Sequence, residues 1–389
     1  MFTDERGVLH ALKNLTFSPK EILVSDNHKN VLRGLHQSPY AKYIYVSKGS
    51  IKDFFWTNDG PVIKLLNAGE SVLVPANCPH GFVTLEESQV IYLLEGEFDP
   101  SKDKNIYWNS PEYPFGLGLD DSKLILSDKD RNAPYKEQYD YLVLGASGYL
   151  GQNCVKYLRS QGRKVLESAA RLEFPEQIRD QIRRSGVKYV VCAAGISGRP
   201  TVEWCETHEY ETYRTNYLDV LNLMEICKDV AHLTIFGSGL VYTGAKSMYT
   251  EEDAPDLESR VYCKWRARLE KALQTNVLYL RIIYPCTFDG HPKCFWTKMK
   301  ARRQSVHDVH VPLTIVPSLF PELPKLIESK ATGIFNFVNE GTISLKEFVN
   351  AEEAISGSGG FCLSTDKLSN IIEVPNVKLT YKALTELVQ

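Results

Sequence analysis

The pattern of apolar and polar positions changes near residue 135. Before this point, short β-rich runs at residues 43–46, 71–74 and 90–93 are separated by turn residues such as Lys-Gly-Ser at 48–50 and Asn-Ala-Gly at 67–69. Several short strands at this spacing are typical of an all-β sandwich or barrel. We therefore predict an all-β domain over residues 1–135.

A polar segment at residues 128–138 predicts a linker, and strand-like runs then alternate with helical stretches. The apolar run 141–144 leads into a glycine turn, and residues 152–161 carry apolar side chains at helical spacing. This βαβ rhythm predicts an α/β Rossmann domain over residues 136–389, with a doubly wound parallel sheet. The part after about residue 284 is more mixed, and we expect it to form a small substrate lobe.

Composition narrows the functional classes. The chain has 389 residues, enough for two or three domains, and a net charge of −3. This balance gives no electrostatic drive toward nucleic acid. No stretch approaches the roughly 20 apolar residues of a membrane span, and the polar start does not resemble a signal peptide. Nine cysteines without a C-x-x-C pair indicate free thiols, so we expect a cytoplasmic protein without membrane partners.

Four motifs of the first half occur in a fixed order: Asp-Glu-Arg-Gly at 4–7, Arg-Gly-Leu-His at 33–36, His-Gly-Phe at 80–82 and Leu-Ser-Asp-Lys-Asp at 126–130. His36 and His80 could be metal ligands in a small barrel, but a cupin metal site usually adds a third histidine and a carboxylate. Residue 38 is Ser where a His-x-His pair would need histidine, so we predict no metal. Together the motifs resemble the dTDP-4-dehydrorhamnose 3,5-epimerase family, which has a metal-free cupin (jelly-roll) fold.

The resemblance implies residues that move protons next to a keto group. His36 would be the base, and Asp130 would raise its basicity and fix its tautomer. Lys42 would stabilise the enolate oxygen, and Tyr92 would deliver a proton to the opposite face. The competing interpretation of Tyr92 is an ordinary core tyrosine of a strand. The residues implied to contact the nucleotide sugar are Arg6, Arg33 and His80.

The first half also departs from this family. Phe98 stands where the family often has a second tyrosine, and Leu9 and Ala11 replace residues used on the nucleotide base. These departures leave open whether the nucleotide is UDP or dTDP. They also leave open whether epimerisation occurs at C3 alone or at C3 and C5.

The glycine turn of the second half predicts dinucleotide binding, because it lies between a strand and a helix. Glycines there let the backbone approach the pyrophosphate at the helix N-terminus. Near the end of the second strand, Arg171 favours a 2′-phosphate, hence NADPH, although NADH remains possible. The cofactor-binding residues that we predict are Gly145, Ser147, Gly148, Tyr149, Leu150, Gly151, Arg171, Ala193, Ala194, Gly195 and Asn216.

Three residues predict carbonyl reduction of the short-chain dehydrogenase type. Ser238 follows a strand, and Tyr262 opens a helical stretch and would donate a proton to the carbonyl oxygen. The usual lysine one turn later is Arg266 here, to which we assign the electrostatic role. Lys264 points to another face of the helix. The alternative is that Tyr262 packs as an ordinary helix aromatic.

Further motifs at 195–208, 214–216 and 333–339 resemble the epimerase/reductase of plant-type nucleotide-rhamnose synthases, and more broadly the dTDP-4-dehydrorhamnose reductases. The resemblance implies reduction of a nucleotide-linked 4-keto-6-deoxy sugar, with Arg199 and Asn216 holding substrate or cofactor. The basic cluster at 298–303 would lie near the diphosphate of the sugar nucleotide or form a solvated helix face.

We therefore predict a bifunctional epimerase and NADPH-dependent 4-keto-reductase that gives an L-rhamnose-type nucleotide sugar. A 2-acetamido sugar remains open. Two alternatives remain: a reductase whose cupin is an inactive dimerisation module, and an NADP-binding regulatory or structural subunit. The resemblance of the barrel also implies a homodimer through residues 1–135.

Overall fold

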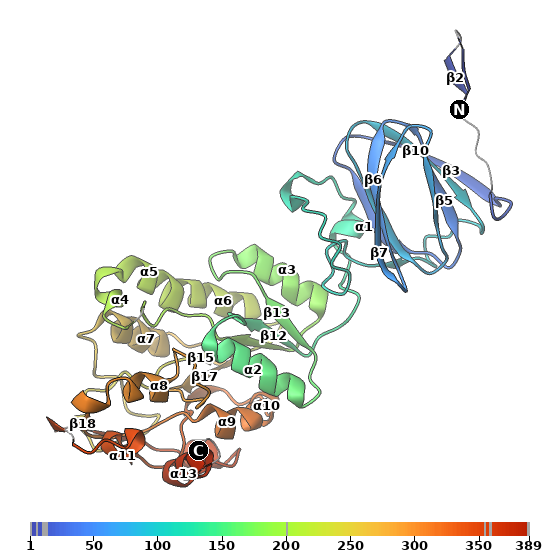
Figure 1. Ribbon diagram of the computed structural model, residues 1–389. Helices are drawn as coiled ribbons and strands as arrows, with labels where there is room; N and C mark the ends of the chain where they lie inside the picture. Colours follow the sequence, from blue (N-terminus) through green and yellow to red (C-terminus); the bar gives the residue numbers. More distant parts are fainter. Residues whose placement is uncertain are drawn as a thin grey trace. The chain divides into compact units, whose positions relative to one another are not determined.

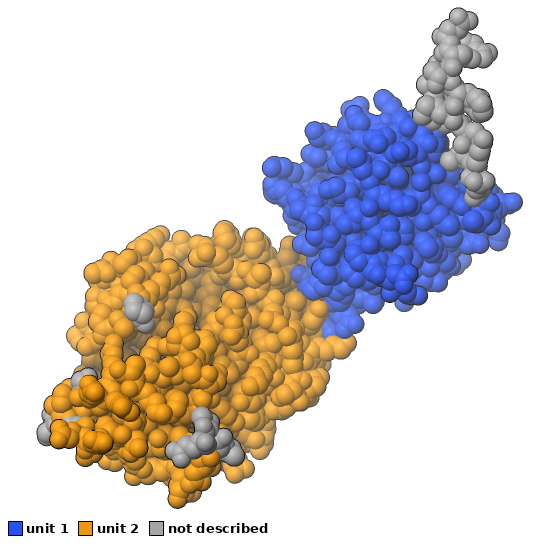
Figure 2. All heavy atoms as spheres, in the orientation of Figure 1, with its two compact units in different colours: residues 1–138 blue, residues 139–389 orange. Residues whose placement is uncertain are grey.

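The computed structural model describes residues 2–4, 7–9, 15–199, 201–353, 355–357 and 360–386. The chain divides into two compact units, residues 1–138 and 139–389 (Figure 2). The division falls at the end of the polar segment 128–138, but the predicted linker is wrong for most of this segment, because the helix at Asp128–Arg131 and the buried Ala133 belong to the first unit. Arg6 lies outside the described residues, so the structure says nothing of its predicted substrate contact.

The first unit consists of two antiparallel sheets, which confirms the predicted all-β cupin-like fold (Figure 1). A separate short pair of strands precedes them, β1 (Phe2–Asp4) and β2 (Gly7–Leu9). In spatial order, the sheets are β3 (Glu21–Asn27), β10 (Ser88–Leu94), β5 (Lys42–Lys48) and β8 (Ser71–Val74), and then β11 (Lys104–Asn105), β4 (Leu32–Gln37), β9 (Pro79–Thr84), β6 (Ser50–Thr57) and β7 (Gly60–Asn67).

Strand alternation places two apolar layers on the two faces of the five-stranded sheet. Phe55 of β6 joins Ile44 and Val90 of the other sheet in one cluster. Its neighbour Phe54 points to the opposite face and packs with Phe115 from the irregular segment that follows β11. That segment continues through η1 (Asp121–Lys123) to α1 (Asp128–Arg131), so both faces of this sheet are covered.

The second unit is built on one parallel six-stranded sheet, which confirms the predicted α/β Rossmann class. β12 is the first strand of this unit and lies between the next two strands, β13 and β14. The connections from β12 therefore lead in opposite directions along the sheet, which creates a switch point. The spatial order is β13 (Val165–Ser168), β12 (Tyr141–Leu144), β14 (Tyr189–Cys192), β15 (His232–Phe236), β17 (Val277–Arg281) and β20 (Gly333–Asn336).

Helices cover both faces of this sheet (Figure 1). One face carries α2 (Tyr149–Ser160), α9 (Val316–Leu319), η4 (Phe320–Glu322) and α10 (Leu323–Glu328), whose apolar residues join the main core. The other helices near the sheet are α3 (Pro175–Ser185), α4 (Trp204–Thr207), α5 (Glu209–Tyr213), η2 (Arg214–Leu218), α6 (Asp219–Cys227) and α7 (Val261–Lys271).

The remaining elements form a lobe with its own apolar cluster around Phe288, Phe348 and Ile315. Its helices are α8 (Phe295–Lys300), η3 (Arg303–Ser305), α11 (Leu345–Val349) and α13 (Val377–Glu386). Leu368 of α12 (Asp366–Ser369) instead packs in the main core of the sheet. Its short strands pair as β16 (Met248–Tyr249) with β23 (Cys362–Leu363), β18 (His307–Asp308) with β22 (Ile355–Ser356), and β19 (His310–Val311) with β21 (Ile343–Ser344). In the described part of the chain, no helix combines the length and the apolar character that crossing a bilayer requires.

A buried ion pair joins α7 to the sheet. Arg281 of β17 donates from Nε to Glu270 Oε1 over 3.0 Å and from Nη2 to Glu270 Oε2 over 2.7 Å. The same guanidinium donates to the carbonyl oxygens of Thr250 and Asp253. Since both charges are paired and further hydrogen-bonded, this pair fixes one end of α7 in a single position on the sheet.

Candidate functional site

A cavity of about 320 Å³ lies inside the barrel unit, and residues from both sheets line it. Five residues predicted for epimerisation or for its substrate line this cavity, although they come from four different strands. They are Arg33, His36, Lys42, His80 and Tyr92. The structure therefore brings together residues that are up to 59 positions apart in the sequence.

His36 forms a hydrogen bond with Asp130, which lies in the short helix α1 near the end of the barrel unit. His36 Nε2 lies 2.7 Å from Asp130 Oδ1, and the Ser127 hydroxyl caps the short helix that carries this aspartate. Burial opposes ionisation of Asp130, but the contact with His36, aided by Ser127 and the Gly34 backbone, holds its pKa below the ordinary value. An ionised Asp130 requires the proton on Nε2, which leaves Nδ1 of a neutral His36 as the basic nitrogen.

Lys42 is buried and Tyr92 is partly buried beside the cavity. Lys42 Nζ donates to Ser38 Oγ over 3.3 Å, and burial lowers its pKa although Asp103 and Asp53 act against this shift. The Tyr92 hydroxyl shares a 3.2 Å hydrogen bond with Ser25 Oγ, and burial raises its pKa, which keeps the phenol neutral. The cavity therefore combines an ammonium, a neutral hydroxyl and an imidazole.

Asp53 was not predicted from the sequence, although it forms a hydrogen bond with the predicted residue His80. Its Oδ1 lies 2.7 Å from His80 Nε2, and both side chains are almost completely buried. An aspartate directly before the run Phe54-Phe55-Trp56 in β6 was the available signal, because an unpaired carboxylate is rarely buried in a strand. Arg33 is also fixed by a hydrogen bond, since its Nε donates to Asn27 Oδ1 over 2.8 Å.

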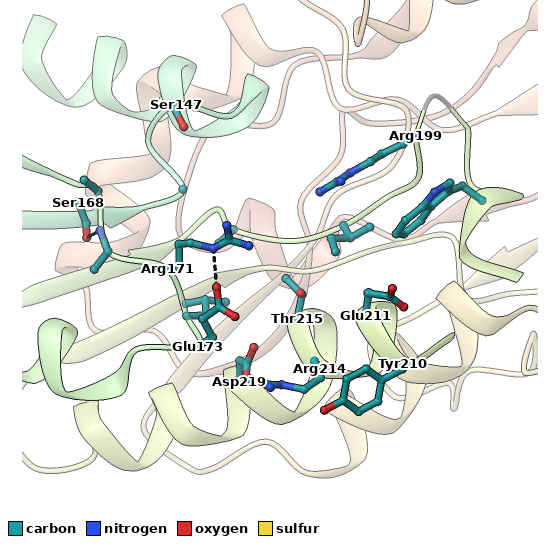
Figure 3. A pocket seen from close by; sticks show the side chains of 17 residues that line it. Ser147, Ser168, Arg171, Glu173, Arg199, Tyr210, Glu211, Arg214, Thr215 and Asp219 are labelled. Atoms are coloured by element: carbon teal, nitrogen blue, oxygen red, sulfur yellow. Dashed lines mark hydrogen bonds and ion pairs between the residues drawn. The ribbon is translucent and has the colours of Figure 1, made fainter. Parts of the chain in front are cut away.

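A second cavity, of about 500 Å³, lies where β12, β13 and β14 end in the other unit (Figure 3). Gly145 and Ser147 of the glycine turn, Ala194 after β14 and Arg171 after β13 all line it. Gly145 has φ 74°, and a Cβ atom there would lie 2.6 Å from the Ala194 nitrogen. This close backbone approach fits a pyrophosphate bound over the turn.

The remaining residues of the glycine motif shape the turn. A Cβ on Gly151 would lie 2.1 Å from the Gly145 oxygen, so α2 can start directly over the turn only with glycine there. Tyr149 points toward the lobe, where its hydroxyl contacts Thr287 Oγ1 at 2.9 Å, and Leu150 packs on the core. Neither of these two side chains lines the second cavity. Gly148 is the N-cap residue of α2.

The end of β13 determines what the adenosine side of a dinucleotide would meet. Glu167 points outward and pairs with Arg159 at 2.6 Å, and Ser168 faces the cavity instead. Arg171 lines the cavity and pairs with Glu173, Nε to Oε1, at 2.7 Å, as Figure 3 shows. Ser168 was missed because the sequence alone did not show which face of the strand ends there.

Asn216 and Arg199 occupy different places around this cavity. Asn216 is fully buried and bonds the Ile196 backbone twice, accepting from the nitrogen at 2.9 Å and donating to the oxygen at 2.8 Å. It therefore fixes the loop after β14, next to Ala193 and Gly195. Arg199 lines the second cavity, with its guanidinium 5.4 Å from the Trp204 ring.

The structure brings Ser238 and Tyr262 together on a third cavity, of about 550 Å³. Ser238 Oγ accepts from the Leu240 nitrogen at 3.1 Å. Arg266 is buried behind the tyrosine, with its guanidinium carbon 5.6 Å from the Tyr262 ring centroid. Its Nε and Nη1 have no hydrogen-bond partner in the described part of the chain. Lys264 pairs with Glu209 instead, so it is not directed toward this cavity.

Arg266 also lies close to the loop after β14. A Cβ atom on Gly195 would lie 2.5 Å from Arg266 Nη2. The guanidinium therefore occupies the space between the tyrosine helix and the strand end that borders the second cavity. A buried positive charge at this point attracts an anionic or electron-rich ligand.

In the described ranges, no three His, Cys, Asp or Glu side chains are grouped so that they could hold a metal ion. The nine cysteines are free thiols.

Comparison with known proteins gives the same division of the chain. The family model described as "dTDP-4-dehydrorhamnose 3,5-epimerase" matches residues 1–138, and the one described as "RmlD substrate binding domain" matches residues 140–353. A bifunctional dTDP-4-dehydrorhamnose 3,5-epimerase/dTDP-4-dehydrorhamnose reductase of Arabidopsis thaliana is 32% identical over 231 residues, which cover 57% of this chain and 76% of the relative.

A trifunctional Arabidopsis UDP-glucose 4,6-dehydratase/UDP-4-keto-6-deoxy-D-glucose 3,5-epimerase/UDP-4-keto-L-rhamnose-reductase, RHM1, is 28% identical over 65% of this chain but only 39% of its own length. The crystal structure of the L780 UDP-rhamnose synthase from Acanthamoeba polyphaga mimivirus has a TM-score of 0.58 at 24% identity, covering 63% of this chain and 98% of that one. A Bacillus anthracis dTDP-4-dehydrorhamnose reductase in complex with NADP shares the fold, with a TM-score of 0.54 at 16% identity over 63% of this chain and 97% of that one.

The buried His80 gives the barrel unit a pH-dependent stability. Burial lowers its pKa below the ordinary value of about 6.5, so below this pH the unfolded chain binds a proton that folded His80 does not. The free energy of unfolding should therefore fall as the pH decreases from 7 to 5.5, by up to about 1.4 kcal/mol per pH unit from this group. Urea unfolding should show a smaller pH slope for His80→Gln.

His28→Gln is the matched control, because the His28 side chain is exposed and should contribute little to the slope. An equal slope for the wild type and His80→Gln would contradict the assignment of the pH dependence to His80.

Proposed function

The chain belongs to the family of RmlD-type reductases and bifunctional dTDP-4-dehydrorhamnose 3,5-epimerase/reductases, and from this premise we propose how its two units act on one nucleotide sugar. A nucleotide-linked 4-keto-6-deoxy hexose is epimerised in the barrel cavity through an enolate. The same C4 ketone is then reduced in the second unit, which gives an L-rhamnose-type nucleotide sugar. The observation that carries this proposal is the convergence of five predicted residues on one barrel cavity.

In the epimerase step, we assign the base to His36, which removes the proton from the carbon next to the ketone. Asp130 holds the proton of the other ring nitrogen and stabilises the imidazolium that forms. The electron pair moves onto the C4 oxygen, where the Lys42 ammonium stabilises the enolate. Tyr92 then returns a proton to the opposite face of the carbon, which inverts it and leaves a tyrosinate that solvent reprotonates.

In the reductase step, Tyr262 donates its hydroxyl proton to the C4 oxygen, while Ser238 on the same cavity orients that oxygen. The bound cofactor supplies the hydride. The glycine turn fits a dinucleotide, because only a chain without a Cβ at Gly145 leaves the close backbone approach described above. Arg266 stabilises the tyrosinate with its buried charge, which replaces the ammonium of the usual lysine.

The two half-reactions can be separated by substitution. Without cofactor, the wild type should incorporate solvent deuterium at C3 of UDP- or dTDP-4-keto-6-deoxyglucose, and His36→Ala should slow this exchange by about 10²–10⁴-fold. Tyr262→Phe should retain the exchange but lose oxidation of NADPH by a similar factor. NMR of the sugar and absorbance at the NADPH band measure the two steps.

Each variant is the control for the other, since both must keep one half-reaction. Absence of exchange in the wild type would show that the barrel is an inactive dimerisation module. Failure of the epimerised ketone to oxidise NADPH would support the regulatory-subunit alternative. Exchange at C5 as well as C3 would identify a double epimerase.

We propose NADPH as the preferred cofactor. Ser168 occupies the place at the end of β13 where an acidic residue would select a free ribose 2′-hydroxyl, and Arg171 lies beside it. A 2′-phosphate would replace the carboxylate of Glu173 as the partner of this guanidinium.

Substitution of Arg171 should reverse this preference. Arg171→Ala should raise the KM for NADPH by about 10-fold to 100-fold and leave the KM for NADH nearly unchanged, since only the phosphate loses a charged hydrogen bond. Steady-state kinetics with both cofactors measure the effect. Arg159→Ala is the control, because Arg159 pairs with the outward-facing Glu167. An equal loss with both cofactors would contradict the 2′-phosphate assignment.

We propose a homodimer formed through the barrel unit, in a cytoplasmic protein whose nine cysteines remain free thiols. The edge strand β3 supports the interface, because Ile22 and Val24 are 58% and 57% exposed on it. An edge strand with exposed apolar side chains is a surface that natural proteins normally cover.

Light scattering of the full chain tests this interface. The wild type should elute as a dimer, and Ile22→Lys should shift it toward the monomer, because a charge would be buried without a partner. Ile63→Lys on the edge strand β7 is the control, since Ile63 is also exposed, on the edge of the other sheet. A monomeric wild type would contradict the proposal.

A further inference from the structure

The basic cluster at residues 298–303 is divided between two cavities. Lys298 and Arg302 line the 550 Å³ cavity that holds Ser238 and Tyr262. Lys300 and Arg303 line a separate cavity of about 400 Å³, which shares no lining residue with the other three. This fourth cavity lies among α8, α11 and α13, which gather in the C-terminal lobe in Figure 1. Lys300 and Arg303 therefore line a cavity that is not part of the sites proposed above.

Aromatic rings form the walls of the fourth cavity. Phe288 has ring centroid distances of 5.6 Å to Trp296 and 6.0 Å to Tyr381, and all three residues line the cavity. These are distances of rings in direct contact, so three different segments contribute one continuous aromatic wall of the cavity. Such a wall suits a flat heterocycle, which can stack on it or contact its ring edges.

Positive charge lies at the same cavity without a carboxylate partner among the described residues. Lys300 Nζ is 4.1 Å from the Trp296 ring centroid, and neither Lys300 nor Arg303 has a carboxylate at ion-pair distance within the described ranges. Glu347, the carboxylate that lines the cavity, pairs with Lys378 at 3.6 Å. Two exposed cations beside aromatic walls attract a ligand that carries both an anion and a ring.

The backbone around the fourth cavity is also unusual. Phe288 has φ 59° and Asn350 has φ 50°, and both residues line the cavity. Asn350 is the C-cap of α11, where a left-handed asparagine is common, whereas a left-handed conformation is uncommon for a bulky residue such as Phe288 and must be enforced by the surrounding lobe. The same fold constraints that place these two residues therefore shape the cavity.

We propose that the fourth cavity binds a nucleoside diphosphate, either free or as part of a nucleotide sugar. The base contacts the rings of Phe288, Trp296 and Tyr381, and the diphosphate contacts Lys300 and Arg303. A volume of about 400 Å³ is within the range of small-ligand sites. Two separate cations match two phosphate groups, since Lys and Arg both bind phosphate oxygens strongly.

The short helix α8 connects this site with the reductase cavity. Phe295, Lys298 and Met299 face the reductase cavity, whereas Trp296 and Lys300 face the fourth cavity. A ligand that fixes Trp296 and Lys300 therefore changes the position or mobility of α8 at the reductase cavity. This coupling rests on the proposed reductase activity, but binding at the fourth cavity does not.

Equilibrium dialysis of the full chain with UDP, and separately with dTDP, counts the bound nucleotide. The double variant Lys300→Ala/Arg303→Ala should bind one nucleotide fewer per chain than the wild type at saturation. The double variant Lys188→Ala/Lys325→Ala should keep the wild-type number, because it removes the same charge from exposed positions that line none of these cavities. Circular dichroism checks that both variants fold.

An unchanged number for Lys300→Ala/Arg303→Ala, or an equal loss in both variants, would overturn the site. The coupling has its own measurement, the inhibition of NADPH oxidation by UDP or dTDP at varied sugar nucleotide. Inhibition should be mixed in the wild type and competitive in Lys300→Ala/Arg303→Ala, and purely competitive inhibition in the wild type would overturn the coupling. If the chain reduces no ketone, the proposed function fails and the nucleotide count still tests the site.

Discussion

The buried pair of Glu270 and Arg281 is the interaction on which the geometry of the second unit depends. Tyr262, Arg266 and Glu270 follow one another at intervals of four residues, so they lie on one face of α7. The ion pair fixes the end of this face on β17, the strand next to β15, which ends two residues before Ser238. The positions of the tyrosine and of the buried Arg266 are therefore set by a contact two helical turns away.

The barrel unit uses two pairs of histidine and aspartate for different purposes. His36 is 28% exposed at its side chain, and its partner Asp130 comes from a short helix at the end of the unit. His80 and Asp53 are both buried between strands, which makes proton exchange with solvent costly. The two His–Asp contacts have the same length of 2.7 Å, but only the His36 side chain is accessible. A residue that transfers protons must be accessible to solvent and substrate, so His36 is suited to this role and His80 is not.

The sequence predicted the architecture because periodicity and motif order are local properties of the chain. The runs at residues 43–46 and 90–93 are rich in strand-forming residues and bounded by turn residues, and the glycine motif lies between a strand and a helix. The convergence of His36, Lys42 and Tyr92 followed from a resemblance that already contains their geometry. Asp53 and Ser168 were not found, because their significance depends on which face of a strand they occupy and on what packs against it.

The fourth cavity was also beyond the reach of sequence, since Phe288, Trp296 and Tyr381 are ordinary core candidates until the lobe brings them together. The basic cluster was visible, but its spacing alone could not show that alternate members point to different sides of α8. Side-chain direction around a helix of only six residues depends on what each side packs against.

The division of the chain at residues 138 and 139 has a kinetic consequence. The barrel cavity and the reductase cavity belong to separate compact units that share one covalent chain, so an intermediate released by one unit is always near a copy of the other. The two sites are therefore present in equal numbers at any expression level. An epimerisation that is reversible by itself is drawn toward product wherever its ketone is then reduced.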